Sequence, residues 1–124
     1  MRHDIYTLPQ ITLVGGQSEQ IRWRIFDLNG DPYDATGISG RFAIVDYSNQ
    51  DVATPLLTLN ITFVTDSETG VNNVAQITLS SADTLNLYGK YIYQITLKSS
   101  FGDVQIPNQG IMFIAHNIDK GYLS

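Results

Sequence analysis

The sequence contains no cysteine, little charge and few of the residues that favour long helices. Without cysteine, the fold cannot depend on disulfides and no site can use a thiolate. Charged residues make up 15% of the chain, and only Glu19 and Glu68 among its twelve acidic residues are glutamates. Long helices favour Glu, Lys, Ala and Leu, whereas the plentiful Ile, Thr, Val and Tyr favour strands. The composition therefore favours a β protein.

Basic residues and long apolar runs are also scarce. Seven scattered basic residues give a net charge of −5, although nucleic-acid affinity depends on Lys and Arg that neutralise phosphates. No apolar run approaches the ~20 residues of a membrane span, and residues 1–4 lead into no apolar stretch of a signal peptide. We expect a soluble protein, made without export, that binds neither nucleic acid nor membrane.

Short runs of alternating polarity recur between turn clusters, at the ~8–12-residue spacing of a sandwich or barrel. The strands expected from them are residues 10–14, 20–26, 41–47, 57–63, 74–79, 90–98 and 105–118. A single helical turn is expected between residues 81 and 87. About seven strands in a chain of one-domain length predict an all-β, immunoglobulin-like antiparallel β-sandwich. We assign residues 1–9 to an N-terminal arm, 10–118 to the sandwich and 119–124 to a C-terminal tail.

Period-two alternation also predicts which side chains point into the core. In residues 20–26, Trp23 shares a face with two isoleucines, while Arg22 and Arg24 face the other way. Residues 41–47 are apolar on both faces, which is typical of a more fully buried strand. The aromatic residues expected in the core are Trp23, Phe42, Phe63, Tyr93 and Phe113.

Asp83, Gly89 and Tyr91 are spaced as in an immunoglobulin-type tyrosine corner. In such a corner, a Tyr early in the sixth strand hydrogen-bonds back to the preceding turn. Tyr93 stands at the inward position that holds Cys in disulfide-bonded domains. The alternative interpretation is that both tyrosines are ordinary core aromatics with solvated hydroxyl groups.

Three stretches resemble the immunoglobulin-like domains of phage tails and baseplates, of which the N-terminal domain of siphophage baseplate upper proteins is a member. Residues 26–37 (FDLNGDPYDATG) are similar to that family's D-x-x-G-x-P-x-D-L-T-G stretch, with Ala35 at the Leu position. Residues 75–84 with 87–95, and residues 100–103 with 110–114, are similar to its second half. The resemblance spans residues 11–118.

The resemblance implies a virion structural protein, made in the host cytoplasm, that docks on tail, baseplate or connector proteins. It also implies a symmetric homo-oligomer in the assembly, with no cofactor. A capsid decoration or neck protein is an alternative within the same structural class. Apolar residues outside the expected core are candidates for the interface: Ile5, Tyr6, Leu8, Tyr122 and Leu123.

Three chemical alternatives were weighed against a structural role. The acidic turn from Asp27 to Asp34 fails as an EF-hand loop, because Pro32 and Ile38 stand where Gly and a bidentate Glu are required. The histidines, His3 and His116, are far apart, and no nucleophile motif or zinc-ligand spacing accompanies them. We therefore expect no metal and no enzymatic activity. Glycan binding remains the other alternative, through aromatic residues expected in loops: Tyr33, Tyr47, Tyr88, Phe101 and Tyr122.

Overall fold

The computed structural model describes residues 6–7, 10–27, 29–51 and 54–123. In this part of the chain almost all regular structure is β-strand, and no helix is long and apolar enough to cross a membrane. The strands are β1 (Tyr6–Thr7), β2 (Ile11–Val14), β3 (Glu19–Arg24), β4 (Ser39–Asp46), β5 (Leu57–Asn60), β6 (Thr62–Val64), β7 (Val74–Leu79), β8 (Gly89–Lys98) and β9 (Val104–Ala115). One helical turn, α1 (Ser81–Thr84), and a 3₁₀ turn, η1 (Lys120–Leu123), complete the elements.

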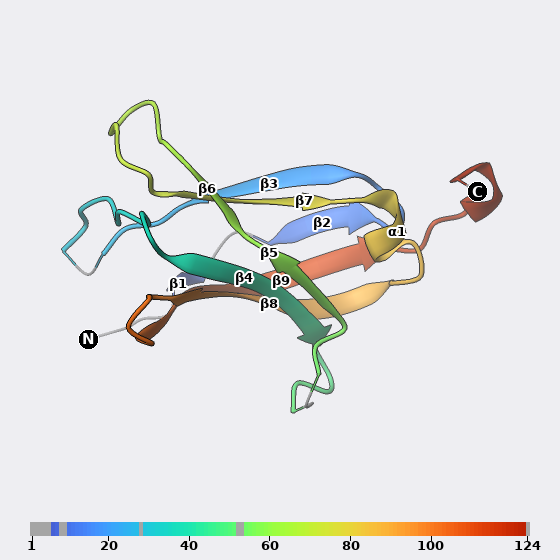
Figure 1. Ribbon diagram of the computed structural model, residues 1–124. Helices are drawn as coiled ribbons and strands as arrows, with labels where there is room; N and C mark the ends of the chain where they lie inside the picture. Colours follow the sequence, from blue (N-terminus) through green and yellow to red (C-terminus); the bar gives the residue numbers. More distant parts are fainter. Residues whose placement is uncertain (1–5, 8–9, 28, 52–53, 124) are drawn as a thin grey trace.

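The strands form two sheets that face each other across the core (Figure 1). The larger, six-stranded sheet has the order β1-β9-β8-β4-β5, and β2 also pairs with β9. The smaller sheet has the order β3-β7-β6. Two packed sheets with these crossovers make the chain an all-β, immunoglobulin-like sandwich.

The strand pairing departs from a purely antiparallel arrangement at one edge. β1 and β2 both run parallel to β9, with Tyr6 opposite Asn108 and Ile11 opposite Met112. The remaining strand pairs are antiparallel. Residues 6–7, which were expected in an arm outside the sandwich, therefore belong to the larger sheet.

The expectation of one strand over residues 57–63 is wrong. The chain leaves the larger sheet after β5 and enters the smaller sheet as β6, so that a single green ribbon crosses between the layers in Figure 1. Ile61 lies at the crossing, where its N–H donates to the carbonyl of Gly40 at 2.9 Å. A β-carbon on Gly40 would lie 3.0 Å from the Phe63 ring and 3.1 Å from Ile61. Glycine at position 40 thus allows the chain to cross this close to β4.

Three aromatic rings from both sheets form the centre of the core. Trp23 of β3, Phe42 of β4 and Tyr93 of β8 are buried, with ring centroids 5.7 to 5.8 Å apart. Burial of each large side chain contributes about 2–3 kcal/mol, and stacked or tilted ring pairs add roughly 1 kcal/mol. These three residues confirm the inward positions predicted from the alternation.

The other two aromatics expected in the core lie elsewhere. Phe113 is 36% exposed, so its assignment to the core is wrong. The inward positions of β9 are Met112 and Ile114, which are buried, and alternation turns Phe113 to the outer face. Phe63 is partly buried and packs against the edge of the core.

Candidate interaction surfaces

The outer face of the larger sheet carries apolar side chains at positions that solvent-facing sheets usually fill with polar ones. Val45 of β4, Ile92 of β8 and Ile111 of β9 lie opposite one another in register and are partly buried. With their neighbours they form what we call the outer stripe: Ala43, Val45, Ile92, Ile111 and Phe113. An apolar patch on an otherwise polar sheet face is typical of a contact with another macromolecule.

Three residues of the outer stripe were expected to be buried: Phe113 in the core, and Ala43 and Val45 in a strand apolar on both faces. Ala43 and Val45 alternate with the buried Phe42 and Ile44, so that β4 is apolar on both of its faces. The second face of such a strand can be covered either by the same chain or by a partner molecule. The sequence pattern is the same in both cases. The segment between β4 and β5 covers part of this face, since Gln50 and Pro55 line a pocket together with Ala43, Val45 and Ile92.

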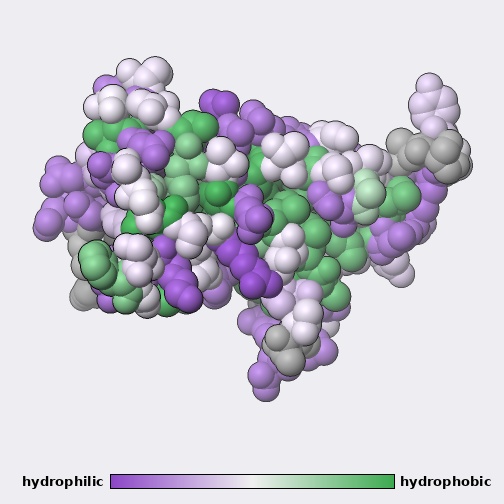
Figure 2. All heavy atoms as spheres, viewed as in Figure 1, coloured by the Kyte–Doolittle hydropathy of each residue, from purple (hydrophilic) through white to green (hydrophobic). Residues whose placement is uncertain are grey.

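Beside the outer stripe lies a groove of about 560 Å³, which we call the basic groove. Residues 47–51 and 54–56 project from the sheet (Figure 1), and Pro55 walls the groove on one side. Its polar lining comes from β4, β5 and β8: Ser39, Arg41, Asn60, Gln94, Thr96 and Lys98. Hydrophilic and hydrophobic residues lie side by side on the visible surface of the sandwich (Figure 2).

Within the basic groove the Ser39 hydroxyl donates to the carbonyl oxygen of Lys98 at 3.2 Å, so the donors left for a ligand are mainly the charged groups of Arg41 and Lys98. Gln109 donates through Nε2 to Gln94 Oε1 at 2.7 Å, and Gln94 donates through Nε2 to Thr96 Oγ1 at 3.0 Å. These bonds use the Gln94 carbonyl oxygen. Among the described residues, neither Arg41 nor Lys98 forms an ion pair with a carboxylate. The groove therefore suits an anionic, acceptor-rich group.

One end of the sandwich has the opposite charge. The loops of residues 26–38 and 99–103 contain four aspartates and no lysine or arginine: Asp27, Asp31, Asp34 and Asp103. We call these loops the acidic end. The hydroxyl and backbone N–H of Thr36 donate to Asp34 Oδ1 and hold the pKa of this carboxyl below its usual value. Phe26 and Phe101 add exposed rings to the same loops.

Two of the aspartates at the acidic end, Asp27 and Asp34, accept hydrogen bonds within turns. Asp27 Oδ1 accepts the N–H groups of Asn29 at 2.8 Å and Asp31 at 3.0 Å, which is an Asx-type turn. Within the described residues, no three His, Asp or Glu side chains are grouped so that they could hold a metal ion.

The tyrosine corner predicted from the sequence is present, with a different role for its aspartate. The Tyr91 hydroxyl donates to the carbonyl oxygen of Tyr88 at 2.9 Å, and burial raises the pKa of this phenol. Gly89 has φ +119°, a backbone conformation that favours glycine. Asp83 instead accepts the N–H of Ser80 at 2.7 Å and caps α1. The corner fixes the start of β8 and is structural.

The predicted terminal interface is only partly described by the structure. Ile5 and Leu8 lie outside the described residues, Tyr6 is in β1 and Leu123 is in η1. Tyr122 is 85% exposed on η1, which extends away from the sandwich at the C-terminus (Figure 1).

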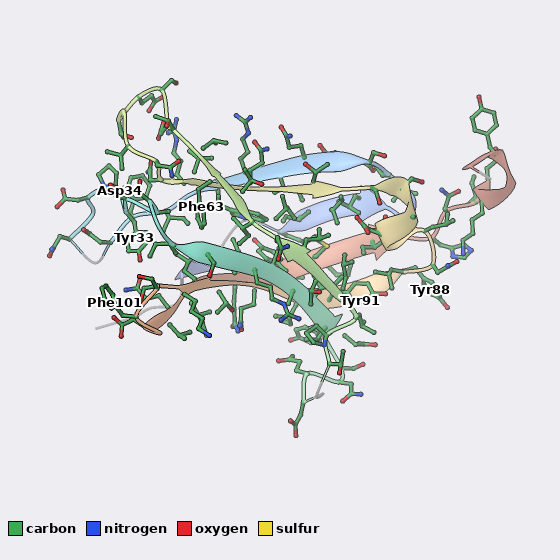
Figure 3. The ribbon with its side chains drawn as sticks, viewed as in Figure 1. Tyr33, Asp34, Phe63, Tyr88, Tyr91 and Phe101 are labelled. Atoms are coloured by element: carbon green, nitrogen blue, oxygen red, sulfur yellow. The ribbon has the colours of Figure 1, made fainter. Side chains whose placement is uncertain are left out.

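The loop aromatics considered for glycan binding do not share one face. Tyr33 packs against the core, and the Lys90 ammonium lies 3.8 Å from the ring centroid of Tyr47. Tyr88 and Phe101 lie at opposite ends of the sandwich (Figure 3). Tyr88 contacts His116 edge-on, with ring centroids 5.1 Å apart. His3, the other histidine, lies outside the described residues.

No family model matches the sequence, and no curated protein matches it. Among solved structures, the fold is similar to that of CopC from Methylosinus trichosporium OB3b, with 9% sequence identity and a TM-score of 0.47. The similarity covers 87% of this chain and 85% of that protein. The assignment to the immunoglobulin-like sandwiches rests on the strand order and pairing described above.

Proposed function

We propose that this chain is a structural component of a phage virion, in the tail or baseplate, and that it acts through protein–protein contacts. The observation that carries the contact role is the outer stripe. It places apolar side chains on the outer face of a sheet, and the segment between β4 and β5 lines a pocket with only some of them, Ala43, Val45 and Ile92. The assignment to a virion rests on the sequence resemblance of residues 26–37 and of the later stretches.

In this proposal the protein works by fitting its neighbours and performs no catalytic step. Its partners are other virion proteins and further copies of itself, and it needs no cofactor, nucleic acid or membrane. The chain is made in the host cytoplasm and becomes part of the particle during assembly. The placement of Tyr88 and Phe101 at opposite ends favours this role over a glycan-binding one, which needs aromatic rings on a common face.

Purified phage particles test this proposal directly. Mass spectrometry of particles released by the host strain should detect the chain in a fixed ratio to tail proteins. Labelling with a specific antibody should place it on the tail or baseplate in electron micrographs. A label on the neck or capsid would support the decoration or neck alternative. Absence of the chain from particles that contain every other tail protein would reject the virion assignment.

A further inference from the structure

Two surfaces of this molecule carry opposite charges and are not neutralised internally. On the outward strand positions of the larger sheet, the charged residues are Arg41, Lys90 and Lys98, and no carboxylate is present. At the acidic end, four aspartates lie without a lysine or arginine in the same loops. The two surfaces adjoin, because Ser39 directly follows the loop that ends at Ile38 and Lys98 directly precedes residues 99–103. Among the described residues no ion pair joins them.

Two like charges lie close together on the positive surface. Arg41 lies opposite Thr96 and Ser39 lies opposite Lys98, so Arg41 and Lys98 are diagonal neighbours on one face. Side chains in such positions are within reach of each other, and like charges there are unfavourable. A carboxylate placed in the basic groove would relieve this repulsion and accept hydrogen bonds from both side chains.

The negative surface is available for such a contact. Asp31 and Asp103 are exposed, and among the described residues their carboxylates form no ion pair. Exposed aromatic rings accompany the charges, since Phe26 is 47% exposed and Phe101 is 92% exposed. The basic groove also has an apolar neighbour, the outer stripe. Each surface thus combines one sign of charge with apolar side chains, and the two are complementary.

From this complementarity we propose that the protein self-associates head to tail, with the acidic end of one copy docked on the basic groove and outer stripe of the next. The occupant of the groove is therefore a second copy of this chain. Packing the larger sheets of two copies face to face would bring Arg41, Lys90 and Lys98 of both copies together, which the charges disfavour. The groove lining also contains no aromatic side chain on which a sugar ring could stack.

Head-to-tail contacts join unlike surfaces, so each added copy leaves one surface of each kind free. Such a contact closes into a ring or continues as an open chain, depending on the rotation between copies. This inference rests on the proposed function as an assembly component and specifies which surfaces the copies use.

Sedimentation velocity on the purified full chain tests the contact. The average mass of the wild-type protein should rise between about 0.01 and 1 mM at low salt, which is the range of small, weak interfaces. About 0.5 M NaCl should weaken the association by roughly ten-fold or more, because exposed charges are screened over a few ångströms. A protein that stays monomeric throughout this range, or an association that salt does not weaken, would overturn the proposal.

Charge reversal on each surface identifies the contact. Arg41→Glu/Lys98→Glu makes both surfaces negative. Asp31→Lys/Asp103→Lys leaves two lysines beside Asp27 and Asp34, so the acidic end loses its net negative charge. For each variant alone, the affinity of self-association should fall by at least about ten-fold relative to the wild type. An equimolar mixture should associate again, since the unchanged acidic end of the groove variant fits the unchanged basic groove of the loop variant. If the mixture stays monomeric while both variants show native near-ultraviolet circular dichroism, the head-to-tail contact is wrong.

Two further measurements separate a lost contact from a misfolded variant, and a failed contact from a failed virion assignment. Arg41→Gln/Lys98→Gln removes the charges without reversing them, so it should weaken association even if the reversed variant folds poorly. The search for the chain in virions, described above, does not depend on self-association. A chain that is found in particles but never self-associates would reject the head-to-tail contact and leave the proposed function standing.

Discussion

At the scale of single residues, the core contains two tyrosines whose hydroxyl groups have opposite roles. The Tyr91 hydroxyl donates to Tyr88 O at 2.9 Å, whereas the Tyr93 hydroxyl is buried and has no hydrogen-bond partner among the described residues. The indole of Trp23 lies close enough to the Tyr93 oxygen to oppose part of the pKa rise that burial causes. Its N–H nevertheless does not reach hydrogen-bonding geometry, so we treat the oxygen as unsatisfied.

Phenylalanine substitutions at these two positions should therefore differ in sign. Tyr93→Phe removes a buried, unsatisfied hydroxyl and should leave the free energy of unfolding unchanged or raise it by up to about 1 kcal/mol. Tyr91→Phe removes the corner hydrogen bond and should lower the free energy of unfolding by about 1–2 kcal/mol. Urea denaturation followed by Trp23 fluorescence measures both. Equal losses in the two variants would show that the Tyr93 hydroxyl has a partner.

The same burial makes stability fall at alkaline pH. Burial raises the pKa values of Tyr91 and Tyr93 above their ordinary value of 10.0 in the folded protein. Above pH 10 the unfolded chain therefore loses protons that the folded protein keeps, and unfolding is favoured. The stability contribution of these neutral phenols is complete below pH 10 and is lost as the pH rises through the folded pKa values. The unfolding temperature of the wild type should be lower at pH 11 than at pH 9. The difference should be smaller in Tyr93→Phe, which lacks one of the two buried phenols.

Gly110 leaves room for the ring of Tyr93 on the neighbouring strand. A β-carbon at Gly110 would lie 2.6 Å from the Tyr93 hydroxyl oxygen and 2.7 Å from two ring carbons. Gly110→Ala must therefore displace the ring from the aromatic centre of the core. We expect a loss of about 1–3 kcal/mol in the free energy of unfolding. Gly121→Ala is the matched control, because a β-carbon there meets no atom within 4 Å. Similar stability of both variants would contradict the close approach.

At the scale of elements, alternation predicts which side of a strand faces inward but not which sheet the strand joins. Trp23, Phe42 and Tyr93 were placed correctly because each lies inside one continuous strand. Residues 57–63 keep their alternation through the crossing at Ile61, and this continuity hid the change of sheet. In β9 the inward positions belong to Met112 and Ile114, so Phe113 between them faces outward, contrary to the prediction.

The candidate surfaces were harder to predict than the core for a physical reason. The outer stripe has the composition of a buried strand, because a partner and the chain's own core favour the same apolar residues. The basic groove depends on pairing that brings Arg41 of β4 beside Lys98 of β8, residues far apart in sequence. The sequence shows the aspartates of the acidic end, but the fold decides which loops lie together and which charged side chains form ion pairs.

Helix α1 holds the turn between β2 and β3 through one buried hydroxyl. Thr84 is fully buried, and its Oγ1 accepts the N–H of Gly16 at 2.9 Å. Thr84→Val keeps the shape of the side chain but leaves this buried N–H unpaired, so we expect a loss of about 1–3 kcal/mol. Thr78→Val on the exposed side of β7 is the control and should change stability by less than about 0.5 kcal/mol. Denaturation midpoints of the two variants decide whether this contact matters.

At the scale of the whole molecule, the requirements of folding and of assembly fall on different faces of the same strands. The inward residues of β4, β8 and β9 form the core, and the outward residues form the outer stripe. A substitution on the outer stripe should therefore affect assembly more than folding. The inward and outward positions of a single strand offer a direct comparison.

Ile92→Ser and Ile95→Ser make this comparison on β8. Ile92 is partly buried on the outer face, so its substitution should cost about 1 kcal/mol or less and leave the isolated protein folded. Ile95 is fully buried, and its substitution should cost about 3–5 kcal/mol. In phage that carry Ile92→Ser, the folded chain should accumulate outside the particles, as measured by immunoblots of purified particles and of the remaining lysate. Normal incorporation of Ile92→Ser would mean that the outer stripe is not an assembly contact. The apolar side chains on that face would then need a different explanation.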